Sequence, residues 1–278
     1  MRGRQSRRGR RYAPAGTARK EHCLTTIAIT RAVSRAIGRC ELTHRQREPI
    51  DVALARRQHA AYEETLREAG CEVRRLPEQP DWPDSVFVED TAIVLDEVAV
   101  STRPGVPSRR GEVASVADVL VEFREVLTMD APATLDGGDV LRLGKRIYVG
   151  ASSRSNRDGI AQFGGLLAPR GYRVEAVAIQ GCLHLKSAVT QVADDLLLVN
   201  PERVDPQAFP GWNSIACDPA EADAANALRI GERVILSASW PRTAARLRQR
   251  GIDVRTVAMS EMEKAEGAVT CCSLIVEQ

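Results

Sequence analysis

Residues 91–101 read TAIVLDEVAVS, and this stretch decides the fold. Two apolar runs, 91–95 and 98–101, flank the polar pair Asp96 and Glu97. Two short apolar segments joined by two polar residues are typical of an antiparallel β-hairpin with a tight turn. The stretch therefore predicts a pair of neighbouring strands.

The hairpin pattern recurs three more times, at intervals of roughly 40 to 50 residues. Each copy has an apolar run, a polar pair and a second apolar run. The copies are 139–143 with 146–151, 188–193 with 196–200, and 226–230 with 233–237. A recurring period of this length indicates a repeated supersecondary unit.

Segments with helical spacing lie between the hairpins. Residues 109–127 place apolar side chains three and four positions apart, and 156–167 and 240–250 do the same. Near the N-terminal end, 25–30 predicts a strand and 51–69 predicts a helix that stops at Gly70. At the other end, residues 268–277 predict a lone strand.

The lone strand finds partners if it joins the first strand of the chain. The chain then holds five strand-strand-helix-strand units, none of which can bury its sheet alone. A closed ring of units buries all five sheets. We therefore expect an α/β fold with pseudo-five-fold symmetry, formed by a single domain over residues 21–278.

The composition is that of a globular protein with unevenly spread charge. Of 278 residues, 44% are hydrophobic and 4% aromatic, and the net charge is +2. Residues 1–20 hold eight of the 39 Lys and Arg and no acid, so the remainder has 31 bases against 37 acids. We expect a disordered basic tail over 1–20, and no nucleic-acid or membrane binding by the folded body. Three roles of this tail stay open: an inert extension, a contact with RNA or anionic lipid, and a transit peptide.

The seven cysteines are scattered and odd in number, which favours a reducing, cytoplasmic compartment over a disulfide framework. The sequence has no CxxC pair, and Cys40 with His44 lacks a second pair of ligands nearby. The sequence therefore predicts no metal site.

Reactive side chains stand just before the repeated hairpins and the last strand. They are Asp90, Asp136, His184 and Cys271. Equivalent positions in a ring of equivalent units face a common axis, so these side chains should converge on one cleft. A thiol, an imidazole and two carboxylates are the groups that covalent catalysis by a cysteine requires.

Each of these residues also has an ordinary interpretation. A cysteine that begins a buried strand is usually a small core residue, and Asp136 before two glycines can simply form a turn. His22 lies near the tail and His59 is expected on a solvated helix face, which leaves His184 for proton transfer. Strand alternation should turn Cys272 away from the cleft and into the core.

Arg109 and Arg154 each begin a predicted helix, where the helix dipole disfavours a cation. A cationic side chain at such an unfavourable position suggests a function for it, such as bidentate binding of a carboxylate.

Six segments, in this order, resemble the dimethylarginine dimethylaminohydrolase family of guanidine-modifying enzymes. They are DSVFVEDTAIV (84–94), STRPGVPSRRGEV (101–113), TLDGGDVL (134–141), VGASSRSN (149–156), LHLKS (183–187) and TCCSLI (270–275). The resemblance implies a five-bladed α/β propeller. It also implies hydrolysis of Nω-methylated arginine to citrulline and a methylamine, without a metal or an organic cofactor.

The resemblance further implies roles for individual residues. Cys271 corresponds to the nucleophile, His184 to the general acid and base, and Asp136 to the carboxylate beside the imidazole. The implied substrate contacts are Asp90 with Glu89 for the guanidinium, Asp84 with the main-chain carbonyl near Leu42 for the α-amino group, and Arg109 with Arg154 for the α-carboxylate.

Other functions stay open beside this one. Arginine and agmatine deiminases carry an Asp two residues after the His, where this chain has Lys186, and the missing anion favours a substrate with a methylated terminal nitrogen. A noncatalytic propeller that binds methylarginine would have the same motifs. A homodimer is a possible assembly.

Overall fold

The computed structural model describes residues 25–278, so the predicted basic tail over 1–20 lies outside the described residues. The described strands form five sheets of three strands each. In every sheet the middle strand pairs antiparallel with one neighbour and parallel with the other. The predicted α/β fold of five repeated units is confirmed.

Four of the sheets follow one another along the chain. They are β3 (Ala92–Val94), β4 (Val98–Ser101) and β5 (Glu125–Thr128); β6 (Val140–Leu143), β7 (Arg146–Gly150) and β8 (Arg173–Val177); β9 (Val189–Ala193), β10 (Leu196–Val199) and β11 (Asn213–Ala216); β12 (Ala227–Ile230), β13 (Arg233–Ser237) and β14 (Asp253–Val257).

The fifth sheet joins the two ends of the described chain. It combines β15 (Leu274–Glu277) with β1 (Thr26–Arg31) and β2 (Cys71–Leu76). β1 and β15 pair antiparallel, with Ile27 opposite Val276. The last strand therefore completes the first unit, as the sequence predicts, and the ring closes.

The five inner strands, β3, β6, β9, β12 and β15, surround a central cavity of about 320 Å³. Apolar cores lie between neighbouring sheets. In one of them, Ile93 and Val100 pack with Val140 and Ile147 of the next sheet and with Phe163. Because each sheet buries its apolar face against a neighbour, the hydrophobic effect favours the closed ring over separate units.

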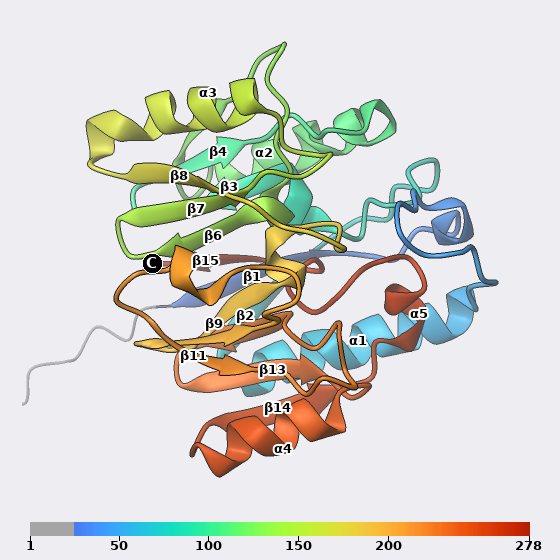
Figure 1. Cartoon of the computed structure of the whole chain (residues 1–278). Helices are drawn as coiled ribbons and strands as arrows, with labels where there is room; N and C mark the ends of the chain where they lie inside the picture. The colour runs from blue at the N-terminus through green and yellow to red at the C-terminus, as the bar shows by residue number, and fades with distance from the viewer. Residues whose placement is uncertain (1–24) are drawn as a thin grey trace, which may run out of the picture.

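Helices lie on the outside of the sheets (Figure 1). They are α1 (Val52–Glu68), α2 (Ala114–Leu120), α3 (Arg157–Leu167), α4 (Pro241–Gln249) and α5 (Ser260–Glu263). α1 begins where the Asp51 carboxylate accepts the Leu54 N–H at 3.0 Å, and it ends before Gly70, which has φ of +95°. None of the helices in residues 25–278 combines the length and apolar character that crossing a bilayer requires.

Three predicted elements differ from the observed ones. The helix predicted over 109–127 is divided into the 3₁₀ helix η3 (Pro107–Glu112) and the short α2, and β5 already starts at Glu125. The third unit lacks the α-helix that a strand-strand-helix-strand unit would have. Between β10 and β11, where every residue is described, the chain forms only the 3₁₀ helix η7 (Pro206–Ala208). The strand predicted over 268–277 starts at Leu274, because residues 269–272 form a turn.

The prediction that His59 is solvated is wrong. His59 is 2% exposed on the inner face of α1, where its Nδ1 lies 3.5 Å from a Glu63 oxygen. Burial lowers the pKa of His59 to about 4, so this imidazole is neutral and part of the core.

Candidate active site

Short 3₁₀ turns position three of the reactive side chains. Each turn precedes an inner strand with at most one residue between them; the turns are η2 (Val88–Thr91), η4 (Gly137–Asp139) and η6 (Leu185–Ser187). Asp90, Asp136 and His184 lie on or beside these turns. Each contributes a carboxylate oxygen or a ring nitrogen, and these atoms lie within 4.8 Å of one another. Cys271 lies in the turn before β15 and lines the same cleft as Asp90 and His184. The four entrance positions therefore meet in one place.

His184 is held between two carboxylates. Its Nε2 lies 3.1 Å from Oδ2 of Asp136, and its Nδ1 lies 3.9 Å from Oδ1 of Asp90. Burial alone lowers the pKa of His184, but Asp90, Asp136 and Asp139 outweigh burial and raise that pKa to about 9. The imidazole is therefore protonated at neutral pH and can act as a general acid.

Two glycines permit this close packing. A Cβ on Gly138 would lie 2.6 Å from Nδ1 of His184 and 2.9 Å from Oδ1 of Asp90, and a Cβ on Gly137 would collide with the carbonyl of Glu89. The glycine pair after Asp136 is therefore required by the imidazole and the neighbouring backbone, in addition to the turn that it forms.

Cys271 is a buried thiol with acidic neighbours. Burial raises the pKa of Cys271, and the carboxylates of Glu89 and Asp90 raise it further. The thiol is therefore protonated in the ligand-free protein, and a cation bound in the cleft would favour the thiolate. Cys272 is fully buried in the core, as predicted, but it lies in the turn and not on the strand.

Arg109 orients Asp90. Its Nη1 lies 2.5 Å from Oδ2 of Asp90, whose Oδ1 accepts the Gly138 N–H at 3.0 Å. Although burial raises the pKa of Asp90, His184 and Arg109 hold it below its usual value, so Asp90 is ionised. Arg109 also pairs with Glu112 at 2.9 Å. The Arg109 guanidinium is thus already engaged by two carboxylates.

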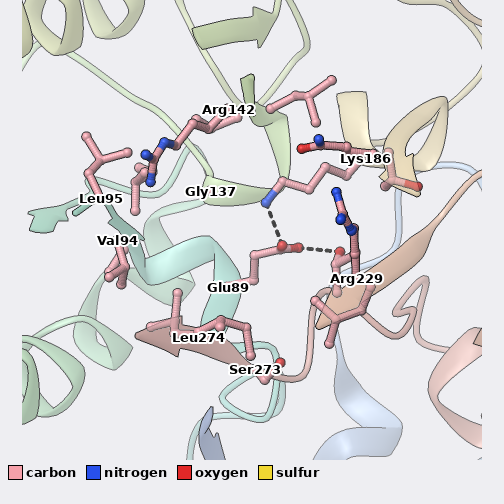
Figure 2. A pocket seen from close by; sticks show the side chains of 18 of the residues that line it. Glu89, Val94, Leu95, Gly137, Arg142, Lys186, Arg229, Ser273 and Leu274 are labelled. Carbon is pink, nitrogen blue, oxygen red and sulfur yellow. Dashed lines mark hydrogen bonds and ion pairs between the residues drawn. The ribbon is translucent and has the colours of Figure 1, made fainter. Parts of the chain in front are cut away.

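Glu89 lines the central cavity (Figure 2). The cleft that Cys271 lines is bordered by Asp90 and not by Glu89. Its Oε1 lies 2.5 Å from Nζ of Lys186, and its Oε2 accepts a hydrogen bond from Oγ1 of Thr270 at 2.7 Å. The structure therefore separates Glu89 from Asp90, although the family resemblance assigns both to the guanidinium.

Asp84 and Arg154 line the cleft near residues 41–43. The Asp84 carboxylate accepts the Glu41 N–H at 3.1 Å, and Nη2 of Arg154 donates to Oγ1 of Thr43 at 3.1 Å. Glu41 lines the cleft, whereas Leu42 packs against a neighbouring core. The structure thus brings Asp84 and the backbone next to Leu42 together.

The spacing of Asp90, Asp136 and His184 would also allow them to ligate a metal ion. Guanidinium groups already lie against both carboxylates, however, with Arg109 on Asp90 and Nη1 of Arg154 3.7 Å from Asp136. A metal ion would have to compete with these cations and with a protonated imidazole. The donor set therefore suits an organic cation better than a metal ion.

The comparisons with known proteins agree on one family. The family model for N,N dimethylarginine dimethylhydrolase, eukaryotic, matches residues 34–208. A dimethylarginine dimethylaminohydrolase of Streptomyces coelicolor is 40% identical over 249 residues, which are 89% of this chain and 95% of that protein. The chain belongs to the dimethylarginine dimethylaminohydrolase family. The resemblance drawn from the six segments is thereby confirmed.

Solved structures of dimethylarginine dimethylaminohydrolases have the same fold. The Pseudomonas aeruginosa protein, as a cysteine-to-serine variant complexed with citrulline, matches with a TM-score of 0.85 and 33% identity over 90% of this chain and 98% of that one. A histidine-to-glycine variant of a dimethylarginine dimethylaminohydrolase, solved as an adduct with S-methyl-L-thiocitrulline, matches with a TM-score of 0.85, 33% identity and the same coverage. The N-terminal domain of a cyanobacterial arginine dihydrolase, at 20% identity and a TM-score of 0.81 over 90% of this chain and 98% of that one, shares the fold alone.

Asp139, a buried acid of this dimethylarginine dimethylaminohydrolase-family site, was not among the residues predicted from the sequence. It accepts hydrogen bonds from Oγ of Ser155 at 2.6 Å and from the Leu185 N–H at 3.0 Å, and so fixes the turn after His184. Burial raises the pKa of Asp139 to about 6. Its place three residues after Asp136, in the same segment, was the signal that could have identified it.

Glu266 was also missed, and no sequence motif marks it. Glu266 has φ of +58°, a conformation that residues other than glycine rarely adopt. Its carboxylate accepts the N–H groups of Thr43, His44 and Arg45 at 2.9, 2.6 and 2.6 Å. Glu266 therefore fastens the segment that carries Thr43 to the rim of the cleft.

Proposed function

We propose that this chain hydrolyses Nω-methylated arginine to citrulline and dimethylamine or methylamine, through a covalent adduct on Cys271. The observation that carries this proposal is the shared cleft of Cys271 and a protonated His184, with Asp90 and Asp136 against the imidazole. Relatives that bear the dimethylarginine dimethylaminohydrolase name, and a family structure that holds citrulline, support the same activity.

The charged groups that line the cleft complement the α-amino and α-carboxylate groups of an amino acid. Asp84 and a main-chain carbonyl near Leu42 would take the α-amino group. Arg154 would take the α-carboxylate, since its hydrogen-bond partner there is the Thr43 hydroxyl. Arg109 would join Arg154 only by giving up part of its contact with Asp90 or Glu112.

The first half-reaction forms the carbon–sulfur bond. The guanidinium, held by Asp90, favours loss of the Cys271 proton to solvent, because a neighbouring cation stabilises the thiolate. The thiolate then attacks the guanidinium carbon. His184 donates its proton to the methylated nitrogen as the carbon–nitrogen bond breaks, so neutral methylamine or dimethylamine leaves and a thiouronium remains on the sulfur.

The second half-reaction releases citrulline. His184 is now neutral, and Asp136 orients it through Nε2. It takes a proton from water as the water oxygen attacks the thiouronium carbon. Collapse of the tetrahedral adduct breaks the carbon–sulfur bond and releases citrulline. The hydroxyl proton of the adduct passes through solvent to the sulfur, so the Cys271 thiol and the His184 imidazolium of the resting protein are restored.

Methylated substrates are favoured by the charges near the leaving nitrogen. Lys186 stands two residues after His184, where deiminases carry an Asp, and its Nζ is bound to Glu89 on the side of the central cavity. The cleft therefore has one anion fewer near the terminal nitrogen of the substrate than the cleft of a deiminase has. This arrangement suits a nitrogen whose hydrogens are replaced by methyl groups.

A substrate panel tests the proposal. The full chain is incubated with asymmetric dimethylarginine, monomethylarginine, arginine and agmatine, and citrulline, carbamoylputrescine and the released amines are measured. We expect citrulline from the two methylated substrates only. Faster turnover of arginine or agmatine, with release of ammonia, would overturn the proposal, and so would binding of methylarginine without turnover.

We further propose a single catalytic domain over residues 21–278, a cytoplasmic location and a possible homodimer. A reducing compartment is supported by the free state of all six cysteines in the described part of the chain. Fractionation of cells that produce the protein, and its mass in solution, test the location and the assembly.

A further inference from the structure

The ring presents five entrance positions, and four of them hold Asp90, Asp136, His184 and Cys271. The fifth, directly before β12, holds Asn226. No step of the proposed reaction uses Asn226, although its side chain is 4% exposed and fully hydrogen-bonded. We propose that Asn226 is a positioning residue that holds the nucleophile segment against the acid–base segment, an inference that rests on the proposed function.

The amide of Asn226 contacts both segments. Its Oδ1 accepts the Thr270 N–H at 3.1 Å. Its Nδ2 donates to Oγ1 of Thr270 at 2.9 Å and to the carbonyl of Lys186 at 3.2 Å. Thr270 directly precedes Cys271, and Lys186 follows His184 by two residues. One side chain therefore joins the backbone next to the sulfur to the backbone next to the imidazole.

Glu89 completes the network from the side of the central cavity (Figure 2). Oγ1 of Thr270, which accepts from Asn226, donates to Oε2 of Glu89 at 2.7 Å. The Glu89 N–H donates to the carbonyl of Cys271 at 3.1 Å, and Lys186 binds the other Glu89 oxygen. The turn of Thr270 and Cys271 is thus held between an amide and a carboxylate, each of which also contacts Lys186.

A cavity lies beside Asn226. Asn226 borders a space of about 460 Å³ that also reaches Leu183 and Gly267, two residues of the catalytic cleft. The hydrogen bonds of Asn226 fix the turn, and a buried Thr270 N–H without its acceptor would be costly.

These contacts require an amide, because the side chain must accept once and donate twice. An ionised carboxylate of the same shape would only accept, and its charge would add to that of Glu89, which already raises the pKa of Cys271. The other charged or titratable groups around this position are Asp90, Lys186, His44, Arg45, Cys182, Arg203, Asp223, Glu263 and Glu266.

The test compares Asn226→Asp and Asn226→Ala with the same changes at Asn200. Asn200 is a matched control, since it is also 4% exposed and its amide binds the carbonyl of Ala222 and the N–H of Glu202, outside the site. For each full-length variant, three quantities are measured: the melting temperature, kcat and KM for monomethylarginine, and the rate at which iodoacetamide alkylates Cys271, located by peptide fragmentation.

We expect the Asn226 variants to lose about tenfold to a hundredfold in kcat, since a small displacement of reacting groups is enough for such a loss. KM should change by less than about threefold, because Asp84 and Arg154 do not contact Asn226. Alkylation of Cys271 should slow in Asn226→Asp, because the added negative charge disfavours the thiolate. The Asn200 variants should lose stability only.

Three results would overturn the inference: a wild-type kcat in Asn226→Asp, a wild-type alkylation rate of Cys271 in Asn226→Asp, or losses at Asn226 and Asn200 that both simply follow the folded fraction. Alkylation needs no substrate, so it reports on Asn226 even if the wild-type protein turns over none of the methylarginines. Failure of the proposed function and failure of this inference are therefore distinguishable.

Discussion

Nε2 of His184 lies 3.1 Å from Oδ2 of Asp136, and both side chains are buried. Burial lowers the pKa of His184, but the charge of Asp90 and this contact with Asp136 outweigh burial and raise the pKa to about 9, against about 6.5 in an unfolded chain. The imidazolium and the stability it contributes are therefore fully present below pH of about 6.5 and are lost as the pH rises through about 9. We expect kcat/KM for methylarginine to fall near that upper pH, as measured in a pH–rate profile.

Asp136→Asn should move this alkaline limb to lower pH, because one of the charges that stabilise the imidazolium is removed. We expect a shift of about one pH unit or more and a loss in kcat of at least about tenfold. The matched control is Asp96→Asn, which removes an exposed carboxylate that binds Arg142 at the surface. An alkaline limb that stays in place in Asp136→Asn would contradict the role assigned to this pair.

Cys271→Ser should abolish turnover and leave substrate binding largely intact, because a hydroxyl is a far weaker nucleophile under these conditions. Acid-quenched mass spectrometry during turnover of a slow substrate should show an adduct on Cys271 in the wild-type protein and none in the variant. Cys272→Ala is the control: this neighbouring thiol is buried in the core, so its removal should lower stability while the adduct still forms. An adduct on any other residue would refute the assignment.

The two arginines should differ in their effects. Arg154→Ala should raise KM by about tenfold or more, because a contact made equally in the ground and transition states is lost. It should lower kcat by less than that, because Nη1 of Arg154 also lies 3.7 Å from Asp136. Arg109→Ala leaves the carboxylates of Asp90 and Glu112 buried without their partner. We expect that variant to lose about 3–5 kcal/mol in the free energy of unfolding, measured by denaturant titration. A fall confined to kcat in Arg154→Ala would oppose the carboxylate role.

Repeated local patterns made the ring and its entrance residues predictable. The two-residue hairpins at Asp96–Glu97 and Gly144–Lys145 are visible in the sequence, and the side chains that precede them meet because the units are equivalent. The direction of each side chain was not predictable. Glu89 and Asp90 are neighbours in the chain but line different cavities, since a 3₁₀ turn places successive side chains about 120° apart.

The burial of a side chain by residues that are distant in the sequence also could not be predicted. His59 lies on a helix that carries Arg56 and Arg57 just before it, yet the packing of that helix against the sheets removes His59 from solvent. The third unit also lacks its helix: the 13 residues between β10 and β11 form turns and η7, whereas the 15 residues between β13 and β14 hold α4. The length of the segment therefore does not reveal which unit keeps its helix.

Gly138→Ala should impair catalysis more than stability. The added methyl group would lie 2.6 Å from Nδ1 of His184 and 2.9 Å from Oδ1 of Asp90, so the imidazole or the carboxylate must move. A displacement of this kind should lower kcat by about a hundredfold, measured with monomethylarginine at fixed pH. Gly165→Ala in α3 is the control, since a Cβ there meets no atom within 4 Å and alanine favours the helix. If both variants kept the wild-type kcat, His184 would not need the position that the structure gives it.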